Sequence, residues 1–250
     1  AVGQIKLINT WQKNLLKHNM TAAQLLLTLN DSEDRQRYLN TKQTINSLLK
    51  MNIIPIINEN ETLSTTALKF GDNDRLAARV AQMISAELLI MLSETDGIYE
   101  KNPKKNPGAK KINKVKKINY KIETAADNRS SKLGSGGMVT KIRAAKICMT
   151  FGCSMIISDG LKKYPLNNIN YNNSSWFLAK KNQKSAKKLW IINQLKPAGK
   201  IHIDNGASKA IKNNKSLLPA GILKIEGNFE KGDAVEIHNK NAKKIAVGLS

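Results

Sequence analysis

Three polar residues stand together where a helix is expected to begin. In the stretch "FGDNDRLAARVAQ", residues 70–82, Asp72, Asn73 and Asp74 precede an Ala-rich pattern with helical spacing. Asp and Asn side chains accept hydrogen bonds from the free N–H groups of a first helical turn, and a carboxylate suits the positive end of the helix dipole. One cap needs one such residue, yet three occur in a chain with 41 Lys plus Arg against 19 Asp plus Glu. The segment is therefore either a helix cap alone or a cap that also positions a ligand.

Three further polar segments have residue types suited to ligand binding. "NENE" at 58–61 follows the apolar run "IIPII", and "SETDG" at 93–97 follows "ELLIML". The third, "LGSGGMVTKIRAA" at 133–145, leads into a helical pattern, and its glycines let backbone N–H groups approach a phosphate at the helix start. Lys141 stands in the first turn, where the helix dipole disfavours a cation, and a bound phosphate would remove that conflict. The spacing is not that of the G-x-x-x-x-G-K-[ST] phosphate loop, and a flexible loop is the alternative interpretation.

Apolar strands that alternate with helices must position these segments. Helical spacing is expected over residues 2–18, about 30–50, 74–85 and 138–151, and short buried strands over 53–58, 87–94 and 153–158. This alternation predicts an α/β fold with a mostly parallel sheet sandwiched by helices. Ligands of such sheets lie beyond the carboxyl ends of the strands, so the polar segments are expected to meet at one edge.

The pattern changes after about residue 180. The charged stretch "KKNQKSAKK" is followed by short strands between turns: "WIINQ", "GKIHID", "GILKIEG", "DAVEIHN" and "KKIAVGL". This spacing predicts a small all-β barrel or sandwich. We therefore expect two domains, residues 1–180 and 188–250.

The composition limits the classes of function. The formal net charge of +22 favours an anionic partner, although most of the basic residues are Lys and not the Arg that base readers prefer. The segment 101–121 holds nine Lys and no acid, and it is either a solvated loop or a funnel for an anionic ligand. Cys148 and Cys153 have no His cluster beside them, so neither a disulfide framework nor a zinc site is expected. No apolar run approaches the ~20 residues of a membrane span, and a cytoplasmic location is the default.

Taken together, the segments resemble the glutamate 5-kinases of the amino acid kinase family. The resemblance runs nearly end to end through "AVGQ", "EDRQRYLNTKQT", "IPIINENE", "KFGDNDRLAA", "LLIMLSETDGIY" and "LGSGGMVTKIRAA". The second domain, with "PAGKIHID", "GASKAI", "SLLPAGI" and "GNFEKGD", looks like the PUA domain that many of these enzymes have.

The resemblance implies that Mg-ATP phosphorylates the side-chain carboxylate of L-glutamate. Lys141 would neutralise the transferring phosphoryl group, and Asp74 would orient the cationic groups around it. The residues implied for glutamate are Asn58, Glu61 and Asn73. Those implied for ATP are Ser93, Glu94, Ser135, Gly136, Gly137, Met138, Val139, Thr140 and Lys141. The cofactors implied are ATP and Mg²⁺, with no metal-ligating side chain assigned.

The resemblance also implies partners and regulation. Proline competes with glutamate in relatives, so the 58–74 segment, with Glu61 and Lys69, is expected to be a shared site for both. A homo-oligomer is expected, and the PUA-like domain could bind RNA.

Two departures from the family pattern affect these expectations. Glu61 and Glu94 stand where the family usually has Asp, and the extra methylene shifts a carboxylate by roughly 1 Å. The family's first strand, its phosphate-contacting Lys and a Ser-Gly loop have no counterpart, so a fragment that is inactive alone is expected. The alternatives are another amino acid kinase, for aspartate or uridylate, and an RNA-binding module.

Overall fold

The computed structural model describes residues 2–28, 30–60, 73–103, 105–127, 137–180, 197–213 and 215–250. The chain divides into two compact units, residues 1–29 with 40–183 and residues 30–39 with 184–250. The domain boundaries drawn from the sequence, residues 1–180 and 188–250, remain a prediction. No helix among the described residues has the length and apolar character that a membrane span requires.

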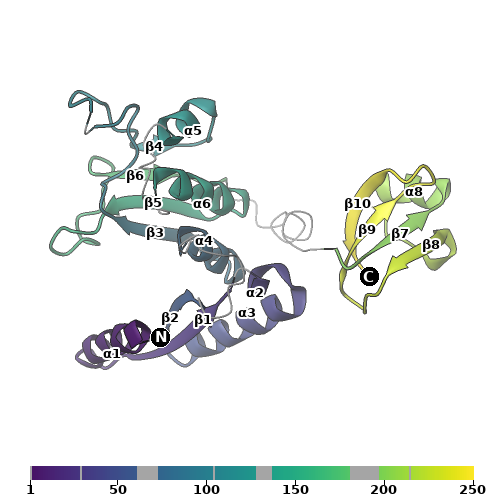
Figure 1. Ribbon diagram of the computed structural model, residues 1–250, viewed down its shortest axis with the longest axis horizontal. Helices are drawn as coiled ribbons and strands as arrows, with labels where there is room; N and C mark the ends of the chain where they lie inside the picture. The colour runs from purple at the N-terminus through teal and green to yellow at the C-terminus, as the bar shows by residue number, and fades with distance from the viewer. Residues whose placement is uncertain are drawn as a thin grey trace. The chain divides into compact units, whose positions relative to one another are not determined.

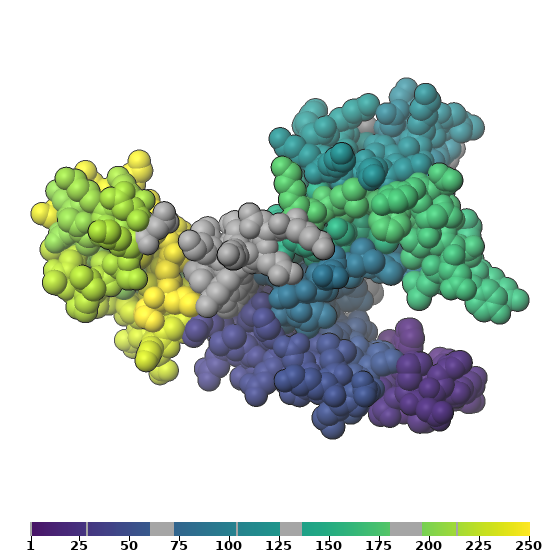
Figure 2. Space-filling model, turned by 180° about the vertical axis from the view of Figure 1, so that it is seen from behind, coloured from purple at the N-terminus to yellow at the C-terminus, as the bar shows by residue number. Residues whose placement is uncertain are grey.

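The first unit contains a two-stranded parallel sheet of β1 (Thr21–Leu27) and β2 (Ile53–Glu59), in register from Thr21 opposite Ile53 to Leu27 opposite Glu59. Helix α1 (Val2–Leu16) precedes β1, and its Gln12 side chain accepts a hydrogen bond from the Ala22 N–H at 3.0 Å. Helix α1 lies at the surface, and none of its described side chains is buried (purple in Figure 2). Two helices connect β1 to β2 along the chain: α2 (Asn30–Glu33), which belongs to the second unit, and α3 (Arg35–Lys50), which belongs to the first unit from residue 40 on.

A second sheet has the strand order β3-β5-β6-β4 (Figure 1). Strand β3 (Leu88–Ser93) is parallel to β5 (Ser154–Asp159), which is antiparallel to β6 (Ser174–Phe177), and β6 is parallel to β4 (Lys114–Val115). Helix α4 (Asn73–Met83) packs on α6 (Met138–Thr150), and α5 (Tyr120–Asp127) packs on α6 as well. Fully buried alanines allow a close approach of α4 to α6: Ala78, Ala144 and Ala145.

The sequence placed most of these elements correctly and missed four, among them β1, whose Ala, Gln and Leu residues favour helices. The expected helices and strands are confirmed as α1, α4, α6, β2, β3 and β5, in a mixed α/β fold, and the helix expected over about 30–50 is present as two helices, α2 and α3. Strands β4 and β6 and helix α5 were missed because two strands are very short and the Ser-rich "SSWF" has no long apolar run. Strand β3 is also not buried on both faces among the described residues, since Leu88, Ile90 and Leu92 are 42%, 37% and 46% exposed.

The second unit contains a sheet of order β10-β9-β7-β8, with β7 (Gly199–Ile203), β8 (Ile222–Gly227), β9 (Ala234–His238) and β10 (Lys244–Leu249). These strands confirm four of the five predicted ones, and "WIINQ" lies outside the described residues. Helix α8 (Asn205–Lys212) was not expected; Asp204 caps it by accepting the Ala207 N–H at 2.7 Å. The short 3₁₀ helix η1 (Pro219–Gly221) precedes β8.

Candidate active site

An ion pair joins the first turns of two helices. Lys141, in α6, places its Nζ 3.0 Å from Oδ2 and 3.4 Å from Oδ1 of Asp74, in α4. The side chains are only 12% and 21% exposed, so water screens the pair less than it would at an open surface. The two residues are 67 positions apart in the chain and meet because α4 packs on α6. The structure thus brings together the two residues for which the sequence implied a catalytic role.

Thr140 ties the same carboxylate to the start of α6. Its Oγ1 lies 2.6 Å from Asp74 Oδ2 and 2.7 Å from the carbonyl oxygen of Gly137, and its single hydroxyl hydrogen can be donated to either. Gly137 is the N-cap residue, and it has no side chain with which to cap the helix. The N–H groups of this first turn are therefore suited to an anion, as the Gly-rich segment predicted.

A second contact joins the end of β2 to the start of α4. Asn58 Oδ1 accepts hydrogen bonds from the Glu59 N–H at 2.9 Å and from Asn73 Nδ2 at 3.2 Å. These bonds occupy the oxygen of the Asn58 amide and turn its NH₂ group away from both donors. Asn73 directly precedes Asp74, so the amide pair and the ion pair both involve the first turn of α4. The polar residues at the start of α4 therefore do more than cap a helix.

Ser93 and Glu94 follow the carboxyl end of β3. Ser93 lies opposite Asp159, the last residue of β5, and its carbonyl oxygen accepts the Gly160 N–H at 2.8 Å. Glu94 is exposed. Neither side chain is bonded to Asp74 or Lys141 in the described part of the chain, so the structure places both at the expected strand end without joining them to the ion pair.

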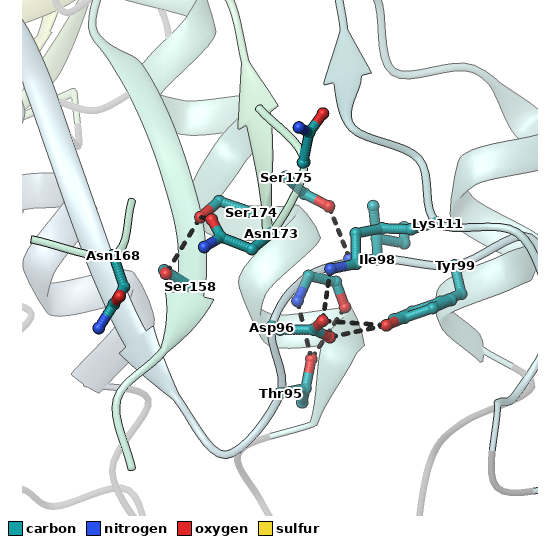
Figure 3. A network of polar contacts seen from close by, with 12 residues as sticks. Thr95, Asp96, Ile98, Tyr99, Lys111, Ser158, Asn168, Asn173, Ser174 and Ser175 are labelled. Atoms are coloured by element: carbon teal, nitrogen blue, oxygen red, sulfur yellow. Dashed lines mark hydrogen bonds and ion pairs between the residues drawn. The ribbon is translucent and has the colours of Figure 1, made fainter. Parts of the chain in front are cut away.

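A polar network anchors the segment that follows Glu94 (Figure 3). Asp96 accepts hydrogen bonds from the Tyr99 hydroxyl at 2.8 Å and from Lys111 Nζ. Burial raises the pKa of Asp96, but the bonds from Lys111 and Tyr99 outweigh it and hold this pKa below its ordinary value. The Ile98 N–H donates to Ser175 Oγ at 2.9 Å, which fixes the segment to β6.

The residues of this network were not among the candidates from the sequence. Asp96 and Tyr99 stand in the quoted "SETDGIY", whereas Lys111 was one of nine Lys in a stretch expected to be a loop. Its partner Asp96 and the low exposure of the pair, which the sequence does not show, distinguish it from an exposed Lys such as Lys121.

Several predicted site residues either pack in the hydrophobic core or lie outside the described residues. Met138 is buried and Val139 packs against the same core, so their side chains stabilise α6 and only their backbone could face a ligand. Glu61, Lys69, Ser135 and Gly136 lie outside the described residues, as does Asp72. Within the described ranges, no group of three or more His, Cys, Asp or Glu side chains could hold a metal ion.

The chain is similar to known proteins over its whole length. Residues 1–159 match the model of the amino acid kinase family, and residues 199–250 match that of the PUA domain. A protein named glutamate 5-kinase from Agrobacterium fabrum is 49% identical over 251 residues, which cover 100% of this chain and 64% of the relative. Another, from Paramagnetospirillum magneticum, is 46% identical over 100% of this chain and 68% of the relative.

Among solved structures, UMP kinase from Ureaplasma parvum covers 66% of this chain at 15% identity, with 63% of its own chain covered and a TM-score of 0.41. The match to the family model includes α4 and α6, which carry Asp74 and Lys141, and β2 and β3, which carry Asn58 and Ser93. The chain spans about two thirds of the length of the curated relatives it matches. From the family match over residues 1–159, the chain belongs to the amino acid kinase family and has a PUA domain at residues 199–250.

Proposed function

We propose that the chain carries the phosphoryl-transfer site of a glutamate 5-kinase. The reaction moves the γ-phosphoryl group of Mg-ATP to the side-chain carboxylate of L-glutamate and forms L-glutamyl 5-phosphate, the first step of proline biosynthesis. The relatives named glutamate 5-kinase, at 46–49% identity, support this proposal. The observation that carries it is that the first turn of α4 makes two polar contacts, the ion pair of Asp74 with Lys141 and the amide pair of Asn73 with Asn58.

Lys141 acts on the group that is transferred. An ammonium group has three N–H donors, and Asp74 engages it from one side, so donors remain for phosphate oxygens. Negative charge spreads over those oxygens in the transition state, and a cation held in place stabilises that charge without reorganising. Asp74, itself fixed by Thr140, keeps the ammonium in position. Phosphoryl transfer requires mainly alignment and charge neutralisation, which this arrangement provides.

ATP lies along the carboxyl edge of β3 and the start of α6. Ser93 and Glu94 contact it from the strand end, and the segment 135–141 contacts its phosphates through backbone N–H groups. Mg²⁺ enters with ATP as part of the substrate, because this ion keeps phosphate and water oxygens as most of its ligands. This role does not require a cluster of protein carboxylates.

L-glutamate lies against Asn58, Glu61 and Asn73. The Asn58 NH₂ group, turned away from Glu59 and Asn73, is a donor suited to a substrate carboxylate. Glu61 is the acidic member of this set and suits the α-ammonium group. The acceptor carboxylate would then lie beside the Asp74–Lys141 pair, where the phosphoryl group arrives.

The test is acceptor-dependent ADP release in a chimaera in which these 250 residues replace the matching segment of the Agrobacterium fabrum relative. Glutamate, aspartate and uridylate are compared, and hydroxylamine traps the acyl phosphate that only a carboxylate acceptor forms. We expect turnover with glutamate alone. A chimaera that prefers aspartate or uridylate would overturn the assignment of glutamate as the substrate, but not the membership of the amino acid kinase family.

Regulation and partners form a second part of the proposal. Proline would compete for the glutamate site, and Lys69→Ala or Glu61→Ala in the chimaera should change glutamate affinity and proline inhibition together. If both properties stay unchanged, the 58–74 segment is not the shared site. We further propose a cytoplasmic homo-oligomer, and RNA as the partner of the PUA domain, which steeply salt-dependent RNA binding would support.

A further inference from the structure

A cleft of about 380 Å³ lies in the first unit, away from the candidate active site. Four lysines line it: Lys116 and Lys117 beyond β4, Lys146 in α6, and Lys180 beyond β6. Apolar side chains of the same three segments, together with Thr150, complete the lining: Ile118, Met149 and Leu178. Chain segments that are far apart in sequence thus converge on one basic cleft with apolar walls.

Ser93 stands at the carboxyl end of β3, and the cleft lies at the opposite end of the strands of the same sheet. The Leu178 N–H donates to the Val115 carbonyl at 2.9 Å, and the Ala179 N–H donates to Oγ of Ser154, the first residue of β5, at 3.3 Å. These bonds place the cleft beside the amino end of β5, whereas the candidate site lies beyond carboxyl ends. Helix α6 begins near Asp74 and ends at the cleft. Its 13 residues span about 20 Å, at about 1.5 Å each, and this length separates the cleft from the candidate active site.

The charges of the cleft are only partly compensated. Lys146 pairs with Glu123 at 2.5 Å, which compensates one of the four charges. Lys116, Lys117 and Lys180 have no ion-pair partner in the described part of the chain. Positive charges around one small space repel one another, and an anion bound between them would relieve that repulsion. The cleft is therefore suited to a ligand with more than one negative charge.

The apolar walls of the cleft indicate what the uncharged part of the ligand is. Ile118 and Met149 pack against the hydrophobic core and Leu178 is half-buried, so a purely ionic ligand would leave apolar surface uncovered. Thioether side chains adapt readily to different apolar shapes. The volume falls within the range of roughly 300–1,000 Å³ for small-molecule sites. None of the described residues that line the cleft is aromatic, whereas single-stranded nucleic acids usually stack their bases on such residues.

We propose that this cleft binds a small molecule in which a phosphate group is attached to an apolar group. The phosphate lies among Lys116, Lys117 and Lys180, since lysine is a compact cation that suits phosphate. The apolar group covers Met149 and Leu178. This proposal is independent of the proposed kinase activity.

The test titrates 1-naphthyl phosphate into the 250-residue chain and follows the backbone amide signals by NMR. We expect the signals of Ile118, Met149 and Leu178 to shift. Inorganic phosphate should bind at least about tenfold more weakly, because it leaves the apolar walls uncovered. The double variant Lys117→Glu/Lys180→Glu should lower the affinity for 1-naphthyl phosphate at least about tenfold, since two attractive charges become repulsive.

A matched variant distinguishes the effect of the charges in the cleft from the effect of the net charge of the chain. Lys209→Glu/Lys212→Glu makes the same charge change on the last turn of α8, in the other unit, and should leave the affinity unchanged. Lys141→Ala should also leave it unchanged, which excludes binding at the candidate active site. Equal affinities of the two double variants would overturn the proposal, as would shifts confined to residues 137–141. Displacement of the probe by a single-stranded oligonucleotide at equal phosphate concentration would instead identify a nucleic-acid surface.

Discussion

Lys141→Ala is expected to lower both kcat and the free energy of unfolding, and the two effects can be measured separately. In the chimaera, loss of one preorganised cation that acts in the transition state should lower kcat by about 10²–10³ with a smaller change in KM. Lys141→Arg should restore little of this loss, because a planar guanidinium does not occupy the place of a compact ammonium.

The effect on stability follows from the ion-pair geometry. At the 3.0 Å between Lys141 Nζ and Asp74 Oδ2, two unit charges attract by about 5.5 kcal/mol at an effective dielectric constant of about 20. Desolvation of both ions offsets most of this attraction, and the remaining exposure of 12% and 21% adds screening. We therefore expect Lys141→Ala to lower the unfolding free energy of the 250-residue chain by about 1–2 kcal/mol. Asp74 keeps its contact with Thr140, so the chain should still fold.

Urea denaturation of the two single variants and the double variant measures the coupling. In an Asp74→Ala background, Lys141→Ala should cost less than it does alone, because its partner is already absent. Lys121→Ala is the control: it removes an exposed pair with Glu100, at 3.2 Å and 73% and 41% exposed, and should cost less than about 1 kcal/mol without changing kcat. A Lys141→Ala enzyme with near-normal kcat, or additive single substitutions, would refute the reasoning.

Three further predictions follow from the site and its support. Because Lys111 and Tyr99 hold the pKa of Asp96 below its ordinary value of 3.8, its contribution to stability is present above that value and lost as pH falls through the lowered one. The difference in unfolding free energy between the wild type and Asp96→Asn should therefore shrink between pH 7 and pH 3, and a constant difference would contradict this. Gly97→Ala should destabilise the chain by about 2 kcal/mol or more in urea denaturation, because φ is +147° and a Cβ would lie 2.3 Å from Ser175 Oγ; Ser175→Gly should partly rescue it, and no rescue would count against the clash. Asn58→Asp in the chimaera should raise KM for glutamate at least about tenfold with a smaller effect on KM for ATP, because it replaces an N–H donor by a charge that repels the substrate; an unchanged KM would remove Asn58 from the substrate site.

The sequence alone determined the features that depend on neighbours along the chain. The apolar run before Asn58 forms β2, and the Ala-rich pattern after Asn73 forms α4. Lys141 could be singled out because a cation in a first helical turn conflicts with the helix dipole. The small β unit was also visible, from regularly spaced short strands, although the Gly-Ala segment of α8 was not recognised as a helix.

The tertiary structure decided which of these features meet. Asp74 pairs with Lys141 only because α4 packs on α6, and no spacing in the chain encodes that contact. The antiparallel direction of β6 was likewise hidden, since strand direction depends on the path of the connection and not on composition. That direction brings Leu178 and Lys180 beside the end of α6 and thereby builds the basic cleft. Local periodicity and capping act over a few residues, whereas side-chain pairing depends on which helix and strand surfaces are buried together.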